Sequence, residues 1–317
     1  MRIAILTSGG DAPGMNACIR AVVRTAIYKN IEVYGIYEGY EGLIDAKFEK
    51  MIESSVADII HRGGTFLRTS RSERFMTDEG FEKAINSLKI FEIDALIVCG
   101  GDGTLKGAKK LKDAGINVIG IPCSIDNDLP YTDYTIGFMT AVETVTEAVS
   151  NIRDTTESHG RANVVEVMGR SCGDIALFSG VSSGAESIII PEMEMNINEI
   201  AEKALMGKNR GKRHHIIIMA EGRGSAFDFA RDFEKLTGID TKVTVLGYLQ
   251  RGGAPSIFDR ILASEMGFKA VEEAENMNSC AIGTTDGHIR VRSFDDIFDV
   301  KKEFRKDLLE ILKVISI

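Results

Sequence analysis

The sequence lacks any apolar run long enough to span a membrane as a helix, which takes about 18 or more residues. Its first ten residues, MRIAILTSGG, hold one basic residue and a short apolar run before the chain turns polar. This run is too short for a signal peptide and is typical of a first core strand. We therefore expect a protein that has no membrane as a partner.

Paired cysteines are also missing. The five cysteines are odd in number and widely spaced, at Cys18, Cys99, Cys123, Cys172 and Cys280. The absence of a C-x-x-C pair disfavours a zinc site, and the spacing disfavours a disulfide framework. Unpaired thiols are typical of a reducing compartment, so we expect a cytoplasmic protein.

An excess of positive charge is absent as well. Lysine and arginine number 38 against 47 acidic residues, and the formal net charge is −9. Nucleic acids and anionic membranes bind basic surfaces, so nucleic acid is not expected as a partner. A local basic pocket for a phosphorylated small molecule remains compatible with this charge. The sequence also has no tandem repeat, low-complexity tract or Pro/Ser-rich linker, so no clean domain boundary is visible.

What the sequence does contain is a regular alternation of short apolar runs with amphipathic segments. Strands are predicted at 2–7, 32–37, 94–100, 117–122, 163–168, 187–191, 215–222 and 241–247, and helices near 14–29, 78–90, 104–114, 138–155, 173–182, 196–209, 228–237 and 257–275. This alternation indicates an α/β protein with parallel sheets covered by helices on both faces. Asp286-Gly287 marks a turn between two extended runs, and a last helix is predicted over 301–314.

Two glycine-rich loops follow predicted strands and precede predicted helices: TSGGDAPGMN at 7–16 and GGDGT at 100–104. Glycines let backbone N–H groups approach a phosphate, and the helix N-terminus adds partial positive charge. In the second loop, the Asp102 carboxylate is free to hold Mg²⁺ through water. The alternatives are a tight βα turn for the first loop and a plain N-cap for Asp102.

A third polar segment, PCSIDNDLP at 122–130, directly follows the apolar run INVIGI. Ligands of open parallel sheets bind beyond the carboxyl ends of the strands, so the three segments are expected to converge on one site. Asp126 and Asp128 alternate along an extended stretch and need not point the same way. One could face a substrate hydroxyl and the other the metal side. The alternative is a turn held by Asx hydrogen bonds.

Together these segments resemble the ATP-dependent 6-phosphofructokinases of bacteria. The match comprises LTSGGDAPGMN, GGDGT, IDND, IGF (136–138), RDT (153–155), VMGR (167–170) and GYLQRGG (247–253). It runs in order from residue 1 to about 270, which is most of the chain. The quintet GGDGT alone also occurs in NAD kinases and diacylglycerol kinases, whereas SGGDAPGMN with IDND and QRGG is specific.

The resemblance implies two doubly wound, Rossmann-like domains with mostly parallel sheets and a chain that crosses between them. An ATP-binding domain would comprise 1–137 with about 251–300, and a sugar-phosphate and effector domain 138–250 with about 301–317. The family is usually homotetrameric. It transfers the γ-phosphoryl group of ATP to the 1-hydroxyl of fructose 6-phosphate with Mg²⁺, in glycolysis.

The resemblance also implies roles for individual residues. Asp126 would take the hydroxyl proton, Asp128 would assist, and Asp102 would hold Mg²⁺. Charge on the transferring phosphoryl group would be stabilised by the Gly10 N–H, Arg71 and Ser124. Further ATP contacts would be Tyr40, Ser72, Phe75, Gly101, Gly103, Thr104 and Gly107. The sugar phosphate would be bound by Ser124, Ile125, Asp126, Met168, Gly169, Arg170, Glu221, Lys242, Tyr248 and Arg251, with Arg161 arriving from a neighbouring subunit.

An effector site for ADP or phosphoenolpyruvate is implied as well. Its residues would be Arg20, Arg24, Arg153, Gly184, Glu186, Arg210, Lys212, Arg213 and His214. Arg20 and Arg24 lie one helical turn apart, and a solvated basic face is the alternative interpretation. Glu53 stands where the bacterial enzymes often have arginine, and its negative charge predicts weaker anion binding.

Four positions bear on the phosphoryl donor and acceptor. Gly103 and Cys123 stand where pyrophosphate-using relatives typically carry Asp and Lys, which favours ATP. Lys242 and Tyr248 stand where the family has Arg and His on the sugar's 6-phosphate. Lysine lacks the planar fork of arginine, and tyrosine carries no positive charge. This predicts weaker binding of fructose 6-phosphate, or a related acceptor such as tagatose 6-phosphate or sedoheptulose 7-phosphate.

A protein that only senses nucleotides is the alternative from another class, as an inactive paralogue. Such a protein has no need for a base, a metal carboxylate and a phosphoryl-stabilising arginine together. The presence of Asp126, Asp102 and Arg71 therefore favours an enzyme.

Overall fold

The structure is a computed structural model that describes residues 1–316, so Ile317, at the end of the second predicted domain, lies outside the described residues. The chain forms two compact units. The first comprises Met1–Ile125, Leu129–Met139 and Arg251–Lys302, and the second comprises Asp126–Asp128, Thr140–Gln250 and the chain from Glu303 onward. The chain therefore passes between the units several times. Within residues 1–316, no helix has the length and apolarity that a membrane span requires.

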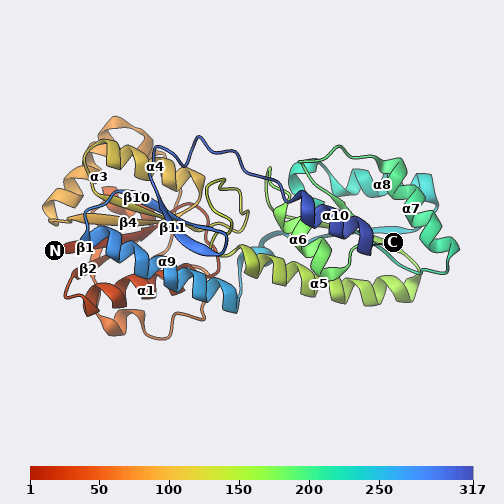
Figure 1. Ribbon diagram of the computed structural model, residues 1–317, viewed down its shortest axis with the longest axis horizontal. Helices are drawn as coiled ribbons and strands as arrows, with labels where there is room; N and C mark the ends of the chain where they lie inside the picture. The colour runs from red at the N-terminus through yellow and green to blue at the C-terminus, as the bar shows by residue number, and fades with distance from the viewer. Residues whose placement is uncertain (317) are drawn as a thin grey trace. The chain divides into compact units, whose positions relative to one another are not determined.

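The first unit is built on a seven-stranded sheet with the order β11-β10-β5-β4-β1-β2-β3 (Figure 1). Five strands run parallel: β1 (Arg2–Thr7), β2 (Glu32–Ile36), β4 (Ala95–Gly100), β5 (Val118–Pro122) and β10 (Cys280–Thr285). The edge strands β3 (Phe48–Lys50) and β11 (His288–Arg292) are antiparallel. Every residue of β4 and β5 is buried, because helices cover both faces of the sheet.

The helices of the first unit lie on opposite faces of this sheet (Figure 1). They are α1 (Met15–Tyr28), α2 (Gly39–Ile44), α3 (Asp78–Ile90), α4 (Asp102–Asp113) and α9 (Ile257–Glu275), with short 3₁₀ turns η1 (Glu53–Val56) and η2 (Arg74–Met76). Side chains of α3 and α4 share one core with β1 and β4. Helices α1 and α9 pack closely, since a Cβ atom at Gly267 would lie 2.8 Å from the Ala21 Cβ.

The second unit has a four-stranded parallel sheet with the order β7-β8-β6-β9. Its strands are β6 (Ala162–Val167), β7 (Ser187–Ile189), β8 (His215–Ala220) and β9 (Thr241–Val245). Its helices are α5 (Phe138–His159), α6 (Asp174–Ser183), α7 (Ile197–Asn209), α8 (Ala226–Thr237) and α10 (Lys306–Ile315), with 3₁₀ turns η3 (Glu221–Arg223) and η4 (Gly247–Arg251). The mixed α/β class with mostly parallel sheets is thus confirmed.

The predicted hairpin near the C-terminus is confirmed. Asp286 and Gly287 both have positive φ values, 52° and 73°, as a two-residue turn of type I′ requires. They connect β10 to β11, which pair in the antiparallel direction. The predicted last helix is present as α10 but begins at Lys306, five residues later than expected from position 301.

Acid is expected to destabilise the second unit through His215, which is buried beside the Phe233 ring. Burial lowers the pKa of His215 to about 4. Below about pH 6.5 the unfolded chain binds a proton that the folded chain does not, so stability present above this pH is lost as the pH falls towards 4. We expect a loss of roughly 3 kcal/mol in the free energy of unfolding from this residue.

The measurement is denaturant unfolding at pH 7 and pH 4.5 for the parent chain, His215→Asn and His159→Asn. His159 is exposed and serves as the control. His215→Asn should unfold with a smaller difference between the two pH values. An equal difference in all three proteins would contradict the assignment.

Candidate active site

Three loops at the carboxyl ends of β1, β4 and β5 are joined by hydrogen bonds. The Ser8 N–H donates to the Cys99 carbonyl at 3.0 Å, and the Thr104 hydroxyl donates to the Ser8 carbonyl at 3.0 Å. The Cys123 N–H donates to the Gly100 carbonyl at 3.0 Å. Because these strands are neighbours in the sheet, the three predicted segments meet at one edge of the first unit.

The glycines of these loops serve different needs. A Cβ atom at Gly100 would lie 2.4 Å from the Thr104 hydroxyl, so packing alone requires glycine there. Gly9 has a φ of 87°, in the region that favours glycine. A Cβ atom at Gly103, in contrast, would meet no protein atom within 4 Å, and its φ is ordinary. The packing of the fold therefore does not require glycine at position 103.

The N-terminus of α4 presents a carboxylate and uncapped backbone donors. Its N-cap, Gly101, offers no side-chain hydrogen bond, so the first N–H groups of the helix remain available. Asp102 begins the helix with its side chain 47% exposed and pairs with Lys106 Nζ at 2.7 Å. Such a helix end favours an anion such as a phosphate.

Asp102 is the carboxylate that the sequence predicts as a magnesium ligand. No cluster of three or more His, Cys, Asp or Glu side chains that could hold a metal occurs among residues 1–316. Mg²⁺ commonly takes one or two carboxylates and completes its shell with phosphate oxygens and water. The single Asp102 carboxylate at the start of α4 fits that pattern.

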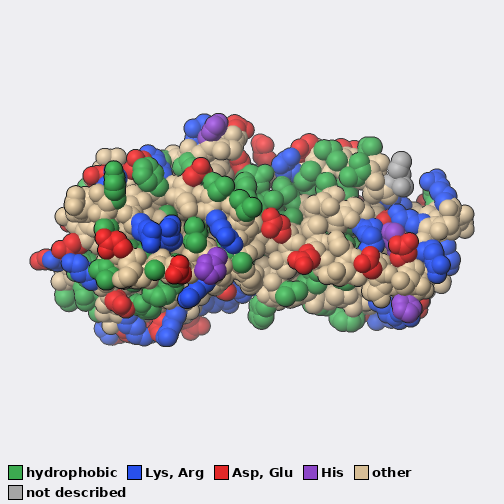
Figure 2. Space-filling view, turned by 90° about the horizontal axis from the view of Figure 1, so that it is seen from below, with side chains coloured by type: hydrophobic (Ala, Val, Ile, Leu, Met, Phe, Trp, Pro, Cys, Tyr) green, Lys and Arg blue, Asp and Glu red, His purple; other side chains and the backbone are tan. Residues whose placement is uncertain are grey.

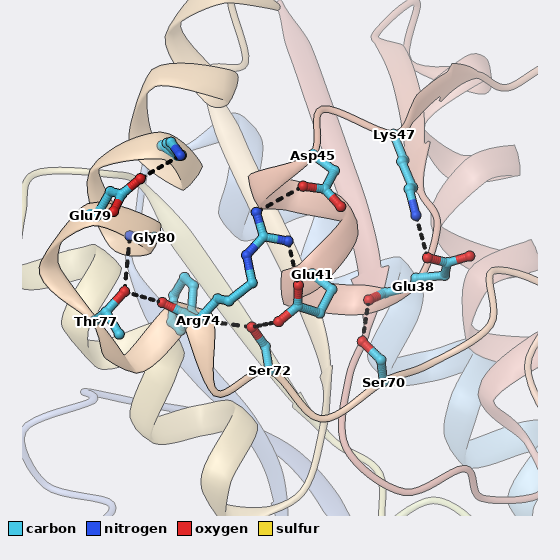
Figure 3. Close-up of polar contacts among 12 residues, drawn as sticks. Glu38, Glu41, Asp45, Lys47, Ser70, Ser72, Arg74, Thr77, Glu79 and Gly80 are labelled. Atoms are coloured by element: carbon cyan, nitrogen blue, oxygen red, sulfur yellow. Dashed lines mark hydrogen bonds and ion pairs between the residues drawn. The ribbon is translucent and has the colours of Figure 1, made fainter.

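A fourth segment, the loop Thr69–Arg74, is attached to the first glycine loop. The Gly9 N–H donates to the Ser70 carbonyl at 3.3 Å, and the Thr69 hydroxyl donates to the Gly9 carbonyl at 2.9 Å. Arg71 follows directly and is exposed. On its other side, Ser72 donates a hydrogen bond to Glu41 on α2 (Figure 3).

Tyr40 and Phe75 form a buried aromatic pair next to the loop that carries Thr104. Their rings stack with centroids 4.0 Å apart, and both side chains are almost fully buried. The Tyr40 hydroxyl donates to the Thr104 carbonyl at 2.7 Å, and burial raises its pKa far above the ordinary value. A Cβ atom at Gly107 would lie 2.8 Å from the Tyr40 ring. These three predicted ATP contacts therefore pack together, and the Tyr40 hydroxyl joins them to Thr104.

Ser124 is fixed at the end of β5. Its N–H donates to the Ile136 carbonyl at 3.1 Å, and its own carbonyl accepts from the Thr135 hydroxyl at 2.6 Å. Ile125, the next residue, is buried. Arg251 also belongs to the first unit: its terminal nitrogen pairs with Asp11 at 2.8 Å and lies 2.5 Å from where a Gly10 Cβ would stand.

In the second unit, Asp126 is paired with an arginine. Asp126 is 6% exposed, and its Oδ2 lies 3.2 Å from Arg170 Nε. Asn127 has a φ of 50°, which asparagine tolerates better than most residues, and its amide donates to Asp174 at 2.8 Å. This left-handed residue separates a buried Asp126 from a partly exposed Asp128.

The loop after β6 carries Met168, Gly169 and Arg170 and is pinned to η3. The Arg170 N–H donates to Glu221 Oε1 at 3.0 Å, and Arg170 has a left-handed φ of 51°. A Cβ atom at Gly222 would lie 1.8 Å from the Arg170 carbonyl, so only glycine permits this approach. Arg170, Glu221 and Asp126 therefore form one polar group.

Two predicted sugar-phosphate residues lie elsewhere in the same unit. Arg161 precedes β6, whereas Arg170 follows it, and six residues of strand separate the two ends by roughly 20 Å. Lys242 pairs with Asn163 near the start of β6. Arg161 and Lys242 are both held by Asp240, at 2.6 and 2.7 Å. Within one chain's second unit, Arg161 and Lys242 therefore lie far from Arg170. Tyr248, a third predicted sugar-phosphate residue, is 79% exposed.

Part of the predicted effector set forms a cluster around Glu186. Its Oε1 accepts from Lys212 at 2.7 Å and lies 3.6 Å from Arg153, which also donates to the carbonyls of Ser183 and Gly184. Burial alone would raise the pKa of Glu186, but hydrogen bonds from Lys212 and the Ile216 N–H hold it below its usual value.

The remaining predicted effector residues are placed as follows. His214 lies 3.0 Å from Arg153, while Arg210 and Arg213 are exposed. Figure 2 shows basic side chains and histidine gathered at the right-hand end of the second unit. Arg20 and Arg24 belong to α1 of the first unit, where Arg24 is exposed.

Sequence reasoning missed the residues that hold the site residues in place. Glu41 binds Ser72, Asp174 binds Asn127, and Asp240 binds Arg161. Of these, only Asp240 stands next to a predicted strand in the sequence, and none belongs to a glycine-rich motif. Their roles follow from contacts between segments far apart in the chain.

Known proteins resemble this chain over its whole length. The phosphofructokinase family matches residues 2–274. Relatives named ATP-dependent 6-phosphofructokinase from Finegoldia magna and Alkaliphilus metalliredigens are 57% and 55% identical, each over 99% of both chains. A phosphofructokinase structure from Saccharomyces cerevisiae has a TM-score of 0.87 and 37% identity, and this chain spans 46% of that longer chain. With this match in sequence and in structure, the chain belongs to the phosphofructokinase family.

Proposed function

We propose that this chain is an ATP-dependent 6-phosphofructokinase. It would transfer the γ-phosphoryl group of ATP to the 1-hydroxyl of fructose 6-phosphate, giving fructose 1,6-bisphosphate and ADP. The observation that carries the proposal is the joined set of loops at one sheet edge, where glycine at position 103 faces open space. The names of the full-length relatives support the same reaction.

The first unit would bind ATP. Backbone N–H groups of Gly10 and of the α4 N-terminus would meet the phosphates, and the Arg71 guanidinium would stabilise charge on the transferring group. Asp102 would hold Mg²⁺, which supplies charge neutralisation on the phosphates when bound. Lys106, which pairs with Asp102, would then exchange its partner for a phosphate oxygen. Ser124, Ser72, Gly101 and Thr104 complete this proposed set.

Asp126 would accept the proton of the acceptor hydroxyl. A buried carboxylate needs a compensating charge, and Arg170 supplies it at 3.2 Å while keeping a terminal nitrogen for substrate. Glu221 orients Arg170 through its backbone N–H. Asp128 would assist beside Asp126. Because phosphoryl transfer depends mainly on positioning and charge, a carboxylate suffices as the base.

A homotetramer would complete the sugar-phosphate site. Arg161 and Lys242 lie at the opposite end of β6 from Arg170, so they would serve the site of a neighbouring subunit. Arg251, which pairs with Asp11, belongs to the same proposed set of sugar-phosphate residues. The enzyme would work in the cytoplasm, within glycolysis.

An effector site for ADP or phosphoenolpyruvate would form around Arg153 and Lys212. Both cations lie beside the buried Glu186 carboxylate. This carboxylate balances one of their two positive charges, so one positive charge remains for an anion. Arg210, Arg213, His214, Arg20 and Arg24 would extend the basic surface. The acidic Glu53 would weaken anion binding there.

Replacing Lys242 by Arg and Tyr248 by His together should tighten binding of fructose 6-phosphate about tenfold. Arginine restores a planar pair of donors for phosphate oxygens, and histidine can add positive charge. The measurement is the KM for the sugar phosphate at saturating ATP. Lys235→Arg, on the exposed surface of α8, is the control for a general lysine-to-arginine effect. No change in KM for the double variant would contradict the assignment of these positions.

The function itself is tested by a phosphorylation assay with Mg²⁺. ATP and pyrophosphate are crossed against fructose 6-phosphate, tagatose 6-phosphate and sedoheptulose 7-phosphate. We expect ATP and fructose 6-phosphate to give the highest kcat/KM. A higher value with another acceptor would reassign the substrate, and absence of turnover with every pair would overturn the proposed function.

A further inference from the structure

We propose that Glu41 is a positioning residue that holds the arginine-bearing loop Thr69–Arg74 ready for the transferring phosphoryl group. This inference rests on the proposed function, since it concerns the nucleotide site of the first unit. It assigns a role to a carboxylate that is not itself expected to touch ATP.

Both oxygens of Glu41 are engaged by the loop (Figure 3). Oε1 accepts the Ser72 hydroxyl, and Oε2 accepts Arg74 Nη1 at 2.9 Å. The second terminal nitrogen of Arg74 donates to Asp45 Oδ1 at 3.0 Å. We call Glu41 with Ser72 and Arg74 the Glu41 clamp. It ties two residues of the loop to one carboxylate on α2.

Arg71 lies between two anchored neighbours. Before it, the Ser70 hydroxyl donates to the Glu38 carbonyl at 2.7 Å. After it, the Ser72 hydroxyl donates to Glu41 and accepts the Phe75 N–H at 3.0 Å. Arg71 itself is exposed. The backbone at this position is therefore held on both sides, while the guanidinium is left on the surface for a ligand.

The carboxylate comes from a short helix whose other residues are buried. Helix α2 is buried at Tyr40, Gly42, Leu43 and Ile44. A Cβ atom at Gly42 would lie 1.6 Å from the carbonyl of Tyr37, the residue that follows β2, so the helix packs closely against this residue. The Glu41 side chain is 21% exposed and that of Arg74 50%, so the partly sheltered acid holds the more exposed base.

Loss of the clamp should affect the chemical step more than the fold. A charge-stabilising group acts through its exact placement, and a shift of about 1 Å can cost on the order of 10²-fold in rate. We expect Glu41→Ala to lower kcat 10- to 100-fold. The KM for the sugar phosphate should stay within twofold, because its proposed residues do not contact the clamp.

The experiment compares Glu41→Ala and Glu41→Gln with Asp45→Asn and Glu79→Gln. Glutamine keeps an acceptor for Ser72 and loses the charge that holds Arg74, so its kcat should fall between those of the parent and the alanine variant. Asp45→Asn removes only the negative charge of the outer partner of Arg74 and should lower kcat less than threefold. Glu79 pairs with Lys83 on the exposed surface of α3, and its variant should match the parent.

Hydrogen exchange provides a readout that does not depend on turnover. Amides of Thr69–Met76 should exchange about tenfold faster in Glu41→Ala, whichever acceptor the parent enzyme phosphorylates. Unchanged exchange in this segment would overturn the clamp even if activity fell. A lower melting temperature together with raised KM values for ATP and the sugar phosphate, with kcat retained, would also overturn it. Failure of the proposed function would show instead as absence of turnover in the parent with every substrate pair.

Discussion

The Asp126→Asn variant is expected to lose about 10²- to 10⁴-fold in kcat, the range that a positioned general base contributes. Asparagine has nearly the same shape and still offers an oxygen to Arg170, whose Nε lies 3.2 Å from the carboxylate. The change therefore removes the proton acceptor and leaves its surroundings in place. The KM values for ATP and the sugar phosphate should change less than threefold.

The control is Asp128→Asn, two residues further along and only partly exposed. Because Asp128 is proposed only to assist, Asp128→Asn should lower kcat less than Asp126→Asn does. The melting temperatures of both variants are measured beside the parent, so that a loss of fold is separated from a loss of chemistry. If Asp126→Asn keeps more than a tenth of the parent kcat, another group accepts the proton.

The Gly103→Asp variant should raise the KM for ATP on the order of 10³-fold without harming the fold. No protein atom would lie within 4 Å of the new Cβ. A carboxylate in the first turn of α4 interacts favourably with the helix dipole, so the melting temperature should stay equal or rise. A like charge about 4 Å from a phosphate costs roughly 4 kcal/mol at an effective dielectric constant of 20.

The matched variant is Gly103→Ala, which adds the same Cβ without the charge. A small rise in the KM for ATP with alanine and a large rise with aspartate would show that charge, not space, excludes the nucleotide. Pyrophosphate is assayed in parallel, since it lacks the α-phosphate near this position. An unchanged KM for ATP in Gly103→Asp would mean that the nucleotide binds away from the α4 N-terminus.

Much of the fold could be predicted because the strongest patterns belong to the most buried elements. Helices α3 and α9 have the predicted bounds, 78–90 and 257–275. Strands such as β4 are apolar throughout because both faces are covered. Turn chemistry was equally readable at Asp286-Gly287, where both residues adopt the positive φ that the hairpin requires.

Elements held by distant contacts could not be predicted in this way. Helix α2 has two glycines in six residues, a composition that disfavours helices, and depends on close packing against Tyr37. Strand β3 is only Phe48–Lys50 and is defined by its pairing with β2. Neither has the length or the periodicity on which sequence patterns depend.

The same distinction applies to the candidate site: its motif loops could be predicted, and the residues that contact them from distant parts of the chain could not. Its loops could be found because glycine and aspartate at strand ends carry a chemical meaning of their own. The partners of those loops could not, since Arg170 lies 44 positions from Asp126 and Arg74 lies 33 from Glu41. The placement of Arg161 and Arg170 at opposite ends of β6 also needed the strand's bounds, which the motifs do not contain.

The interleaved order of the two units has a consequence for biosynthesis. The seven-stranded sheet is continued beyond β5 only by β10, through the pairs Cys280–Ile119 and Ala281–Gly120. During translation, β5 therefore waits as an open edge while the ribosome makes the whole of the second unit's sheet. An open edge of buried, apolar character pairs readily with other chains. A chain that ends before Cys280 lacks β10 and keeps β5 as such an open edge.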